Sequence, residues 1–252
     1  MAMLMTSQAS SATERVGNFA LLDHEGNYHQ LRKYGDSKAV VIISTATNCL
    51  ENIEKLPKYR LLRTTWENQG ISFLAINSSV DDDLADVRLM DSLHNVDLPI
   101  LLDDSQLVAE TLGLSKAGEI IVLEPNRFLV LYRGGLDIEP RRARPNRGIN
   151  AQPGTTDLAE TLALAVAGQL DAFDETVVTE SIGCELDFPA RDQHVSNVPD
   201  YAMDVAPILQ EKCVSCHIEG GIAPFAMDSH MMVQGWSPMM KEVVMTLSLI
   251  HI

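Results

Sequence analysis

Residues 39–56 read AVVIISTATNCLENIEKL, and this stretch decides how the larger part of the chain folds. Its opening run, Ala39–Ser44, is rich in β-branched residues and is typical of a strand buried on both faces of a parallel sheet. Apolar residues then recur at helical spacing, at Ile53, Leu56, Tyr59, Leu62 and Trp66. The stretch therefore predicts a buried strand followed by a helix, with Cys49 at the junction and a kink at Pro57.

Strands and helices alternate on both sides of this stretch, as they do in α/β domains. The turn DHEGN predicts a hairpin, with Gly26 at a position that needs a positive φ. Gly70 is expected to end the first helix, and Ser105 to cap a short helix that ends near Gly113. The remaining expected elements are the hairpin strands Phe19–Leu22 and Tyr28–Leu31, the strands Ile71–Asn77, Pro99–Leu102, Glu119–Leu123 and Leu129–Arg133, a helix opened by Asp81–Asp83 that runs to Leu93, and the helix Asp157–Leu170.

Composition divides the chain into two domains. Residues 138–156 are rich in Pro, Arg, Gly and Asn, which predicts an exposed loop. Residues 185–200 contain two prolines and no periodic apolar pattern, so we interpret them as a linker. The sequence therefore predicts an α/β domain at 13–184 and a smaller domain at 201–246.

The charge and the N-terminus restrict where the protein acts. A net charge of −16 argues against nucleic acid and anionic membranes as partners. No apolar run approaches the roughly 20 residues that a membrane helix needs. Residues 1–12 resemble the end of a secretory signal, with Ser10 and Ala12 fitting the small-residue cleavage pattern. We therefore expect an exported protein whose true start lies upstream.

The motif Cys213-Val-Ser-Cys216-His217 carries the strongest chemical signal. Two thiols one helical turn apart can add to the two vinyl groups of one porphyrin, and the adjacent histidine then reaches the iron. We therefore expect covalent haem c on Cys213 and Cys216, with His217 as an axial ligand. A zinc site that also uses His230 and a dithiol redox pair are the competing interpretations. The preceding segment, Ala202–Lys212, has the apolar spacing of a helix.

Asp204–Val244 closely resembles the single-haem cytochrome module found beside redoxin domains and copper type II, ascorbate-dependent monooxygenase domains. In that module the second axial ligand is a methionine in a later Met-Pro-Pro segment, which this chain does not contain. Most of the methionines that follow the motif are expected to pack the haem pocket. These are Met227, Met231, Met232, Met239, Met240 and Met245.

The last six residues, Leu247–Ile252, read LSLIHI, which one frame of a common transposase-adapter DNA end encodes. This match predicts that natural sequence stops near Thr246 and that residues 247–252 are an artefact. Together with the N-terminal stub, it predicts a gene fragment cut at both ends. The sixth haem ligand is then expected to lie beyond the cut.

Residues 13–184 resemble the thioredoxin-fold family of redoxins, alkyl hydroperoxide reductases and thiol-specific antioxidant proteins. The resemblance is carried by Phe19–Gly26, Ala39–Leu56, Gly70–Asn77, Leu98–Leu112, Leu131–Asp137 and Ile182–Glu185. It implies a catalytic thiol at Cys49, a guanidinium at Arg133 that stabilises a thiolate or peroxide, and a resolving thiol or a structural residue at Cys184. With the other two cysteines on haem, Cys49 and Cys184 can also pair in an oxidising compartment.

The family pattern is incomplete around the expected thiol. Asn52 stands where thioredoxins have their second cysteine, and Ala46 stands where peroxiredoxins have Thr or Ser. Ala117-Gly118 occupies the segment in which the thioredoxin fold usually places a cis-proline. These departures leave no local dithiol, so the chemistry would depend on a single cysteine of the motif.

Cys49 is expected to open a helix, where amide N–H groups and the helix dipole favour the thiolate. We therefore expect a partly accessible thiol with a pKa below the ordinary ~8.5. Glu51 and Glu54 in the first turns act in the opposite direction. A buried, inert cysteine is the alternative.

Together these features predict an α/β, thioredoxin-like domain followed by a small, incomplete, all-α cytochrome c-like module. The expected function is that of a periplasmic or secreted bacterial redox protein, which combines a peroxiredoxin- or thioredoxin-like thiol domain with an electron-transfer haem. The expected partners are a redox protein or a small thiol or peroxide substrate. A non-catalytic redoxin scaffold that carries the haem, and the N-terminal part of a copper monooxygenase, are the alternative functions.

Overall fold

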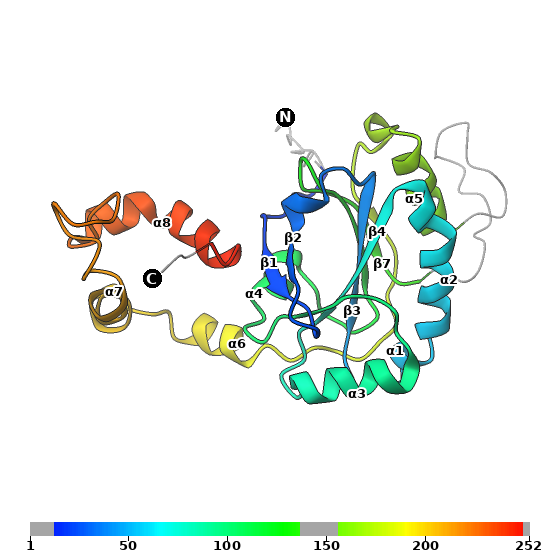
Figure 1. The fold of residues 1–252 in the computed structure, drawn as a ribbon, viewed down its shortest axis with the longest axis horizontal. Helices are drawn as coiled ribbons and strands as arrows, with labels where there is room; N and C mark the ends of the chain where they lie inside the picture. The colour runs from blue at the N-terminus through cyan, green and yellow to red at the C-terminus, as the bar shows by residue number, and fades with distance from the viewer. Residues whose placement is uncertain (1–12, 137–155, 249–252) are drawn as a thin grey trace, which may run out of the picture. The chain divides into compact units, whose positions relative to one another are not determined.

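The computed structural model of the protein describes residues 13–136 and 156–248. The chain divides into two compact units, Met1–Leu186 and Asp187–Ile252, which we describe separately. Figure 1 draws them as a ribbon whose colour runs from blue to red along the chain. The expected signal remnant at 1–12, nearly all of the expected loop at 138–156, and residues 249–252 of the adapter-like tail lie outside the described residues.

A six-stranded sheet forms the centre of the first unit, in the order β5-β4-β3-β6-β7-β8. β3 (Ala39–Thr45) runs parallel to β4 (Ile71–Asn77) and antiparallel to β6 (Ile120–Glu124). Every residue of β3 is buried, which confirms the buried strand that its sequence predicts. The remaining strands are β5 (Ile100–Leu102), β7 (Leu129–Gly134), β8 (Val177–Val178) and the hairpin pair β1 (Ala20–Leu22) and β2 (Tyr28–Gln30).

Helices cover both faces of this sheet. Val41 and Ile43 of β3 belong to one apolar cluster with Tyr59 of α2 (Leu56–Trp66) and Leu162 of α5 (Asp157–Val166). Figure 1 shows α2 and α5 on one side of the sheet, and the β1–β2 hairpin and α4 on the other. The remaining helices of the unit are α1 (Leu50–Ile53), α3 (Leu84–His94), α4 (Leu107–Leu112) and the short 3₁₀ turns Leu31–Tyr34, Glu67–Gln69 and Leu170–Ala172.

The starts of α3 and α4 are both capped by aspartate side chains. Asp83 caps α3 by accepting the N–H groups of Ala85 and Asp86, so the predicted acidic start is confirmed. The prediction that Ser105 caps α4 is wrong, because the buried carboxylate of Asp103 accepts the N–H groups of Val108 and Ala109 instead. Burial raises the pKa of Asp103 to about 6.

The helix that follows β3 is divided rather than kinked. α1 makes one turn, the chain passes through Glu54 and Lys55, and α2 begins with Pro57 in its first turn. A proline is tolerated there because its missing N–H would have no partner inside the helix. The predicted kink at Pro57 is therefore a helix start. Gly26 and Gly70 both have φ of 92°, which confirms the left-handed positions predicted for them.

In the described part of the second unit, the regular elements are helices, separated by turns and irregular segments. They are α6 (Pro189–Ser196), a π-helical turn, α7 (Ala206–Lys212) and α8 (His230–Met245). Residues 185–200, which we interpret as a linker, contain the helix α6, whose residues are all outside the core and follow no apolar period. No helix within the described residues is long and apolar enough to cross a membrane.

Candidate redox site

Cys49 lies between the central strand of the sheet and the first helix. It follows β3 and is the N-cap residue of α1. Its side chain is only 1% exposed and packs in a small apolar cluster with Ala46 and Ala117, against which Cys184 and Leu186 also pack. The predicted position is confirmed, but the predicted accessibility of the Cys49 thiol is wrong because the cluster covers it.

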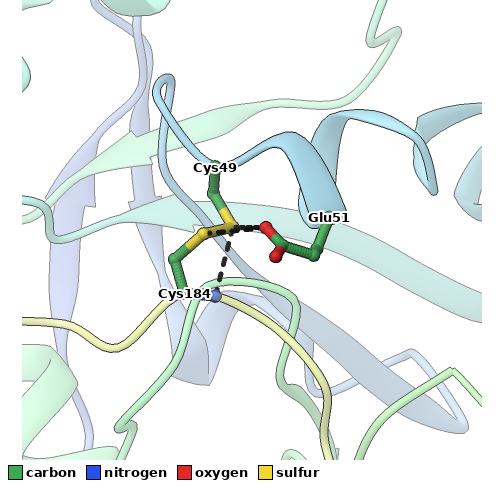
Figure 2. A group of neighbouring side chains, drawn as sticks. All are labelled: Cys49, Glu51 and Cys184. Atoms are coloured by element: carbon green, nitrogen blue, oxygen red, sulfur yellow. Dashed lines mark hydrogen bonds between the residues drawn. A yellow bond between two sulfur atoms is a disulfide. The ribbon is translucent and has the colours of Figure 1, made fainter.

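Cys49 is bonded to Cys184 across a sequence separation of 135 residues, with 5.7 Å between the two Cα atoms. Cys184 follows the last strand of the unit and is partly exposed. Figure 2 shows the two sulfur atoms facing each other from separate segments, with Glu51 beside them. The two cysteines that sequence could not place relative to each other therefore form one redox pair.

Backbone contacts hold the Cys184 segment beside α1. The N–H of Ala117 donates to the carbonyl of Cys184 at 2.8 Å, and the N–H of Leu186 donates to Ser115 at 2.8 Å. Gly183 is required here, because a Cβ on it would lie 1.7 Å from the carbonyl oxygen of Ala117. The Ala117-Gly118 segment thus faces the redox pair, as its place in the family pattern predicts.

Polar groups reach both sulfur atoms. The N–H of Cys184 points at Cys49 Sγ from 3.1 Å. Glu51 Oε2 lies 3.2 Å from Cys184 Sγ and 3.6 Å from Cys49 Sγ. The site therefore offers a donor to the buried sulfur and a carboxylate to both, closest to the exposed one.

Lys55 connects the helix side of the site to the Cys184 segment. Its ammonium group donates to the carbonyl of Ile182, two residues before Cys184. Burial lowers the pKa of Lys55, and the neighbouring carboxylate of Glu51 acts in the opposite direction. The lysine therefore fixes the backbone that carries the exposed sulfur.

Several polar atoms beneath the pair are buried. Asn52, which replaces the second cysteine of thioredoxins, donates from its amide nitrogen to Thr45 Oγ1 at 2.7 Å and so ties α1 to β3. Its amide oxygen, the Ser44 hydroxyl and the Tyr59 hydroxyl have no hydrogen-bond partner among the described residues. Burial also raises the pKa of Tyr59.

The contacts of Arg133 are with residues other than the two cysteines. Its guanidinium donates to the carbonyls of Leu112 and Gly113 at 2.6 and 3.1 Å. It also pairs with Glu14 at 2.9 Å and with Glu119 at 3.4 Å. None of these partners is a cysteine, so the contacts give no support to its expected role toward a thiolate. The guanidinium instead joins β7 to the end of α4.

The second group of expected site residues lies at the end of α7. Cys213 and Cys216 are both free thiols of intermediate exposure. His217 Nδ1 lies 2.8 Å from the carbonyl oxygen of Phe225. Because a carbonyl only accepts, Nδ1 carries the proton, and Nε2 of the neutral ring keeps its lone pair.

Glu51 and Lys55 are the site residues whose roles sequence reasoning missed. Glu51 was expected only to oppose the thiolate of Cys49, and Lys55 was not singled out. Their spacing of four residues was the available signal, because the sequence predicts one continuous helix there and residues four apart lie on one face of a helix. In the described chain, the donor atoms of Cys49, Glu51 and Cys184 are also the only three metal-type ligands that lie within 4.8 Å of one another.

Comparison with known proteins supports the redoxin resemblance. Residues 12–136 match the model of the AhpC/TSA family. No curated protein matches the chain.

Among three similar solved structures, two share the fold with TM-scores above 0.5. A hypothetical protein from Sinorhizobium meliloti 1021 is 24% identical, with a TM-score of 0.54 over 72% of this chain and 95% of that one. An uncharacterized conserved protein from Geobacillus kaustophilus is 22% identical, with a TM-score of 0.54 over 75% and 98%. A thiol:disulfide interchange protein of the thioredoxin family from Chlorobium tepidum TLS is 14% identical, with a TM-score of 0.45 over 63% and 99%. Residues 12–136 therefore correspond to an AhpC/TSA redoxin domain, and the first unit has an α/β, thioredoxin-like fold with a bonded cysteine pair.

Proposed function

We propose that the first unit catalyses thiol–disulfide exchange through Cys49 and Cys184, and that the second unit carries covalent haem c as an electron carrier in an exported protein. The observation that carries the first part is the bond between these two cysteines at the end of β3. One sulfur is buried and the other is partly exposed beside a carboxylate. A pair arranged in this way can accept two electrons from an external dithiol without opening the core.

Exchange with thiols fits the geometry better than reduction of peroxide. A peroxidatic thiolate must be reached by the peroxide, and Cys49 is only 1% exposed. The segment that covers Cys49 brings a second cysteine with it, and that cysteine is partly exposed. We therefore assign protein or low-molecular-weight thiols and disulfides as the substrate class.

Three groups of the second unit support the haem assignment. Cys213 and Cys216 are free and one helical turn apart, as attachment to two vinyl groups requires. His217 is oriented by Phe225 so that Nε2 remains available to a metal. When bound, the haem supplies reversible one-electron transfer.

Export agrees with both parts of the proposal. Disulfides form readily in oxidising compartments outside the cytosol, so the bond between Cys49 and Cys184 fits an exported protein. The thiol pair moves two electrons and a haem moves one, so the proposal assigns no direct transfer between the two groups.

The test of the exchange activity is a redox titration of the full chain in dithiothreitol buffers, with thiols counted by alkylation and mass. A catalytic pair should have a potential between about −270 and −120 mV. The same protein should accelerate the reduction of insulin disulfides by dithiothreitol, and Cys49→Ser and Cys184→Ser should abolish this acceleration. The C213A/C216A double variant is the matched control and should keep it.

A potential below about −300 mV, without insulin reduction, would identify the bond as structural. That result would support a non-catalytic scaffold. Peroxide-dependent oxidation of Cys49 that survives in Cys184→Ser would instead indicate a single-thiol peroxidase.

A further inference from the structure

The two sulfur atoms of the disulfide differ in their exposure to solvent. Cys49, the residue at the position of the family's reactive thiol, is 1% exposed. Cys184, which comes last in the domain, is the partly exposed sulfur. Exchange requires an external thiolate to approach one sulfur of the disulfide, so access selects which sulfur is attacked.

We propose that Cys184 is the sulfur that exchanges with partner thiols, that Cys49 is the leaving group, and that Glu51 holds the Cys184 thiol protonated in the reduced pair. This inference rests on the exchange activity proposed above. It reverses the roles that the redoxin resemblance implies, in which Cys49 is the reactive thiol and Cys184 resolves.

The contacts of the two sulfur atoms support this division. The N–H of Cys184 lies 3.1 Å from Cys49 Sγ, so negative charge that develops on Cys49 meets a hydrogen-bond donor. Glu51 Oε2 lies 3.2 Å from Cys184 Sγ and 3.6 Å from Cys49 Sγ, so its carboxylate opposes negative charge on both sulfurs, and more strongly on Cys184. The thiolate is therefore favoured at Cys49 and the neutral thiol at Cys184, where it can donate to Glu51.

The reaction balances as two successive exchanges. A partner thiolate attacks Cys184 Sγ, a bond forms between the partner sulfur and Cys184, and the Cys49–Cys184 bond breaks with its electron pair left on Cys49. A second thiolate of the partner attacks the first partner sulfur and releases Cys184, which takes up a proton from water and donates it to the Glu51 carboxylate as a hydrogen bond. The partner dithiol is oxidised to a disulfide, and the protein pair gains two electrons.

Peptide mapping tests which sulfur is attacked. The oxidised full chain is treated with reduced glutathione, quenched in acid and digested with trypsin, which places Cys49 in the 39–55 peptide and Cys184 in the 148–191 peptide. We expect glutathione on the 148–191 peptide in at least tenfold excess. Glutathione mainly on the 39–55 peptide, in a protein that still reduces insulin, would overturn this inference and leave the proposed function intact.

A second measurement does not depend on trapping an intermediate. In the folded protein, Cys49→Ser should react with oxidised glutathione at least ten times faster than Cys184→Ser, and the two rates should become equal in urea. A faster Cys184→Ser variant would overturn the assignment. If the wild-type disulfide resists both glutathione and dithiothreitol, the proposed function fails and this inference fails with it.

The role of Glu51 is tested by the pH dependence of Cys184 alkylation in reduced Cys49→Ser protein. Adding Glu51→Gln should lower the midpoint by about one pH unit, because a neighbouring negative charge is lost. Glu54→Gln is the matched control, since Glu54 is also exposed and, among the described residues, the carboxylate beside the two sulfurs is that of Glu51. An unchanged midpoint in Glu51→Gln would remove Glu51 from the proposal.

Discussion

The two cysteine pairs of this chain differ in almost every respect. Cys49 and Cys184 are 135 positions apart and bonded within the packed redoxin domain. Cys213 and Cys216 are three positions apart, follow a seven-residue helix and are both free. The first pair forms because the fold brings two distant segments together. The two cysteines of the second pair are already close because they are close in the sequence. The comparison shows that two redox groups of one chain can depend on structure to very different degrees.

The surroundings of the two pairs differ in the same way. The first pair lies in a domain whose central strand is buried throughout, with Cys49 buried and Cys184 partly exposed. In the second unit, large apolar side chains remain exposed, including Ile222 at 92% and Met231 at 81%. Such side chains on so small a unit are typical of a surface that packs against another apolar group. A porphyrin attached at the neighbouring thiols is the group that we propose for this surface.

The largest expected effect separates the two pairs completely. In an export-competent host with haem-attachment machinery, the wild-type chain should be red, and C213A/C216A should contain no covalent haem because both thioether bonds are lost. The measurement is covalent haem per protein after denaturation. The Cys49–Cys184 bond should form in both proteins, which alkylation before and after reduction checks. A colourless wild type with stoichiometric zinc would overturn the haem proposal.

The next effect tests how strongly the first pair depends on the fold. Gly183→Ala places a methyl group against the carbonyl of Ala117, and the Cys184 segment must move away from Cys49. We expect most of the disulfide to be lost and the domain to be destabilised by about 3 kcal/mol. Free-thiol titration and urea unfolding measure the two effects. Gly17→Ala is the control, because its added Cβ would meet only Thr111 at 3.9 Å.

A smaller effect is expected where a side chain, rather than the backbone, holds the same segment. Lys55→Met removes the donor to the carbonyl of Ile182 and should free the segment that carries Cys184. We expect dithiothreitol to reduce the disulfide about five to ten times faster, as the loss of about 1 kcal/mol of anchoring predicts. Lys58→Met, one turn further along the exposed surface, should leave the rate unchanged. Equal rates in all three proteins would show that backbone contacts alone fix the segment.

The smallest effect concerns the polar layer beneath the pair. The buried hydroxyl of Tyr59 has no partner among the described residues, so Tyr59→Phe should change the free energy of unfolding by less than about 1 kcal/mol, in the stabilising direction. Tyr132 is the matched control, because its hydroxyl lies 2.6 Å from both the Gly135 carbonyl and Thr179 Oγ1. Tyr132→Phe should lower the free energy of unfolding by about 1–3 kcal/mol, because it leaves the buried partners of the hydroxyl unpaired. Equal costs in denaturant unfolding would show that Tyr59 has a partner in solution.

Features encoded within a few residues were predictable from the sequence. The buried strand β3, the left-handed Gly26 and the acidic start of α3 were all recognised, because each depends on its own neighbours. The failures have physical reasons too. Asp103 displaced Ser105 as the cap of α4 because a carboxylate at the end of a strand could reach the helix start. Helix α6 escaped notice because none of its residues is buried.

The candidate site divides along the same line. The position of Cys49 after the strand followed from sequence, but its burial and its partner did not, because both depend on a segment 135 residues away. The contacts of Glu51 with both sulfurs, and of Lys55 with Ile182, became apparent only once that segment was placed. Haem on the second unit, in contrast, remains a prediction that rests on a local motif.

The Cys49–Cys184 bond also has a consequence for the chain as a polymer. It closes a covalent ring whose two ends are 135 residues apart. In the chain-entropy treatment, a ring of this size lowers the conformational entropy of the unfolded chain and so stabilises the folded domain by about 5 kcal/mol. The oxidised domain should therefore resist heat better than the reduced one, although their folded contacts are nearly the same. The melting temperature of the domain should therefore distinguish its oxidised form from its reduced form.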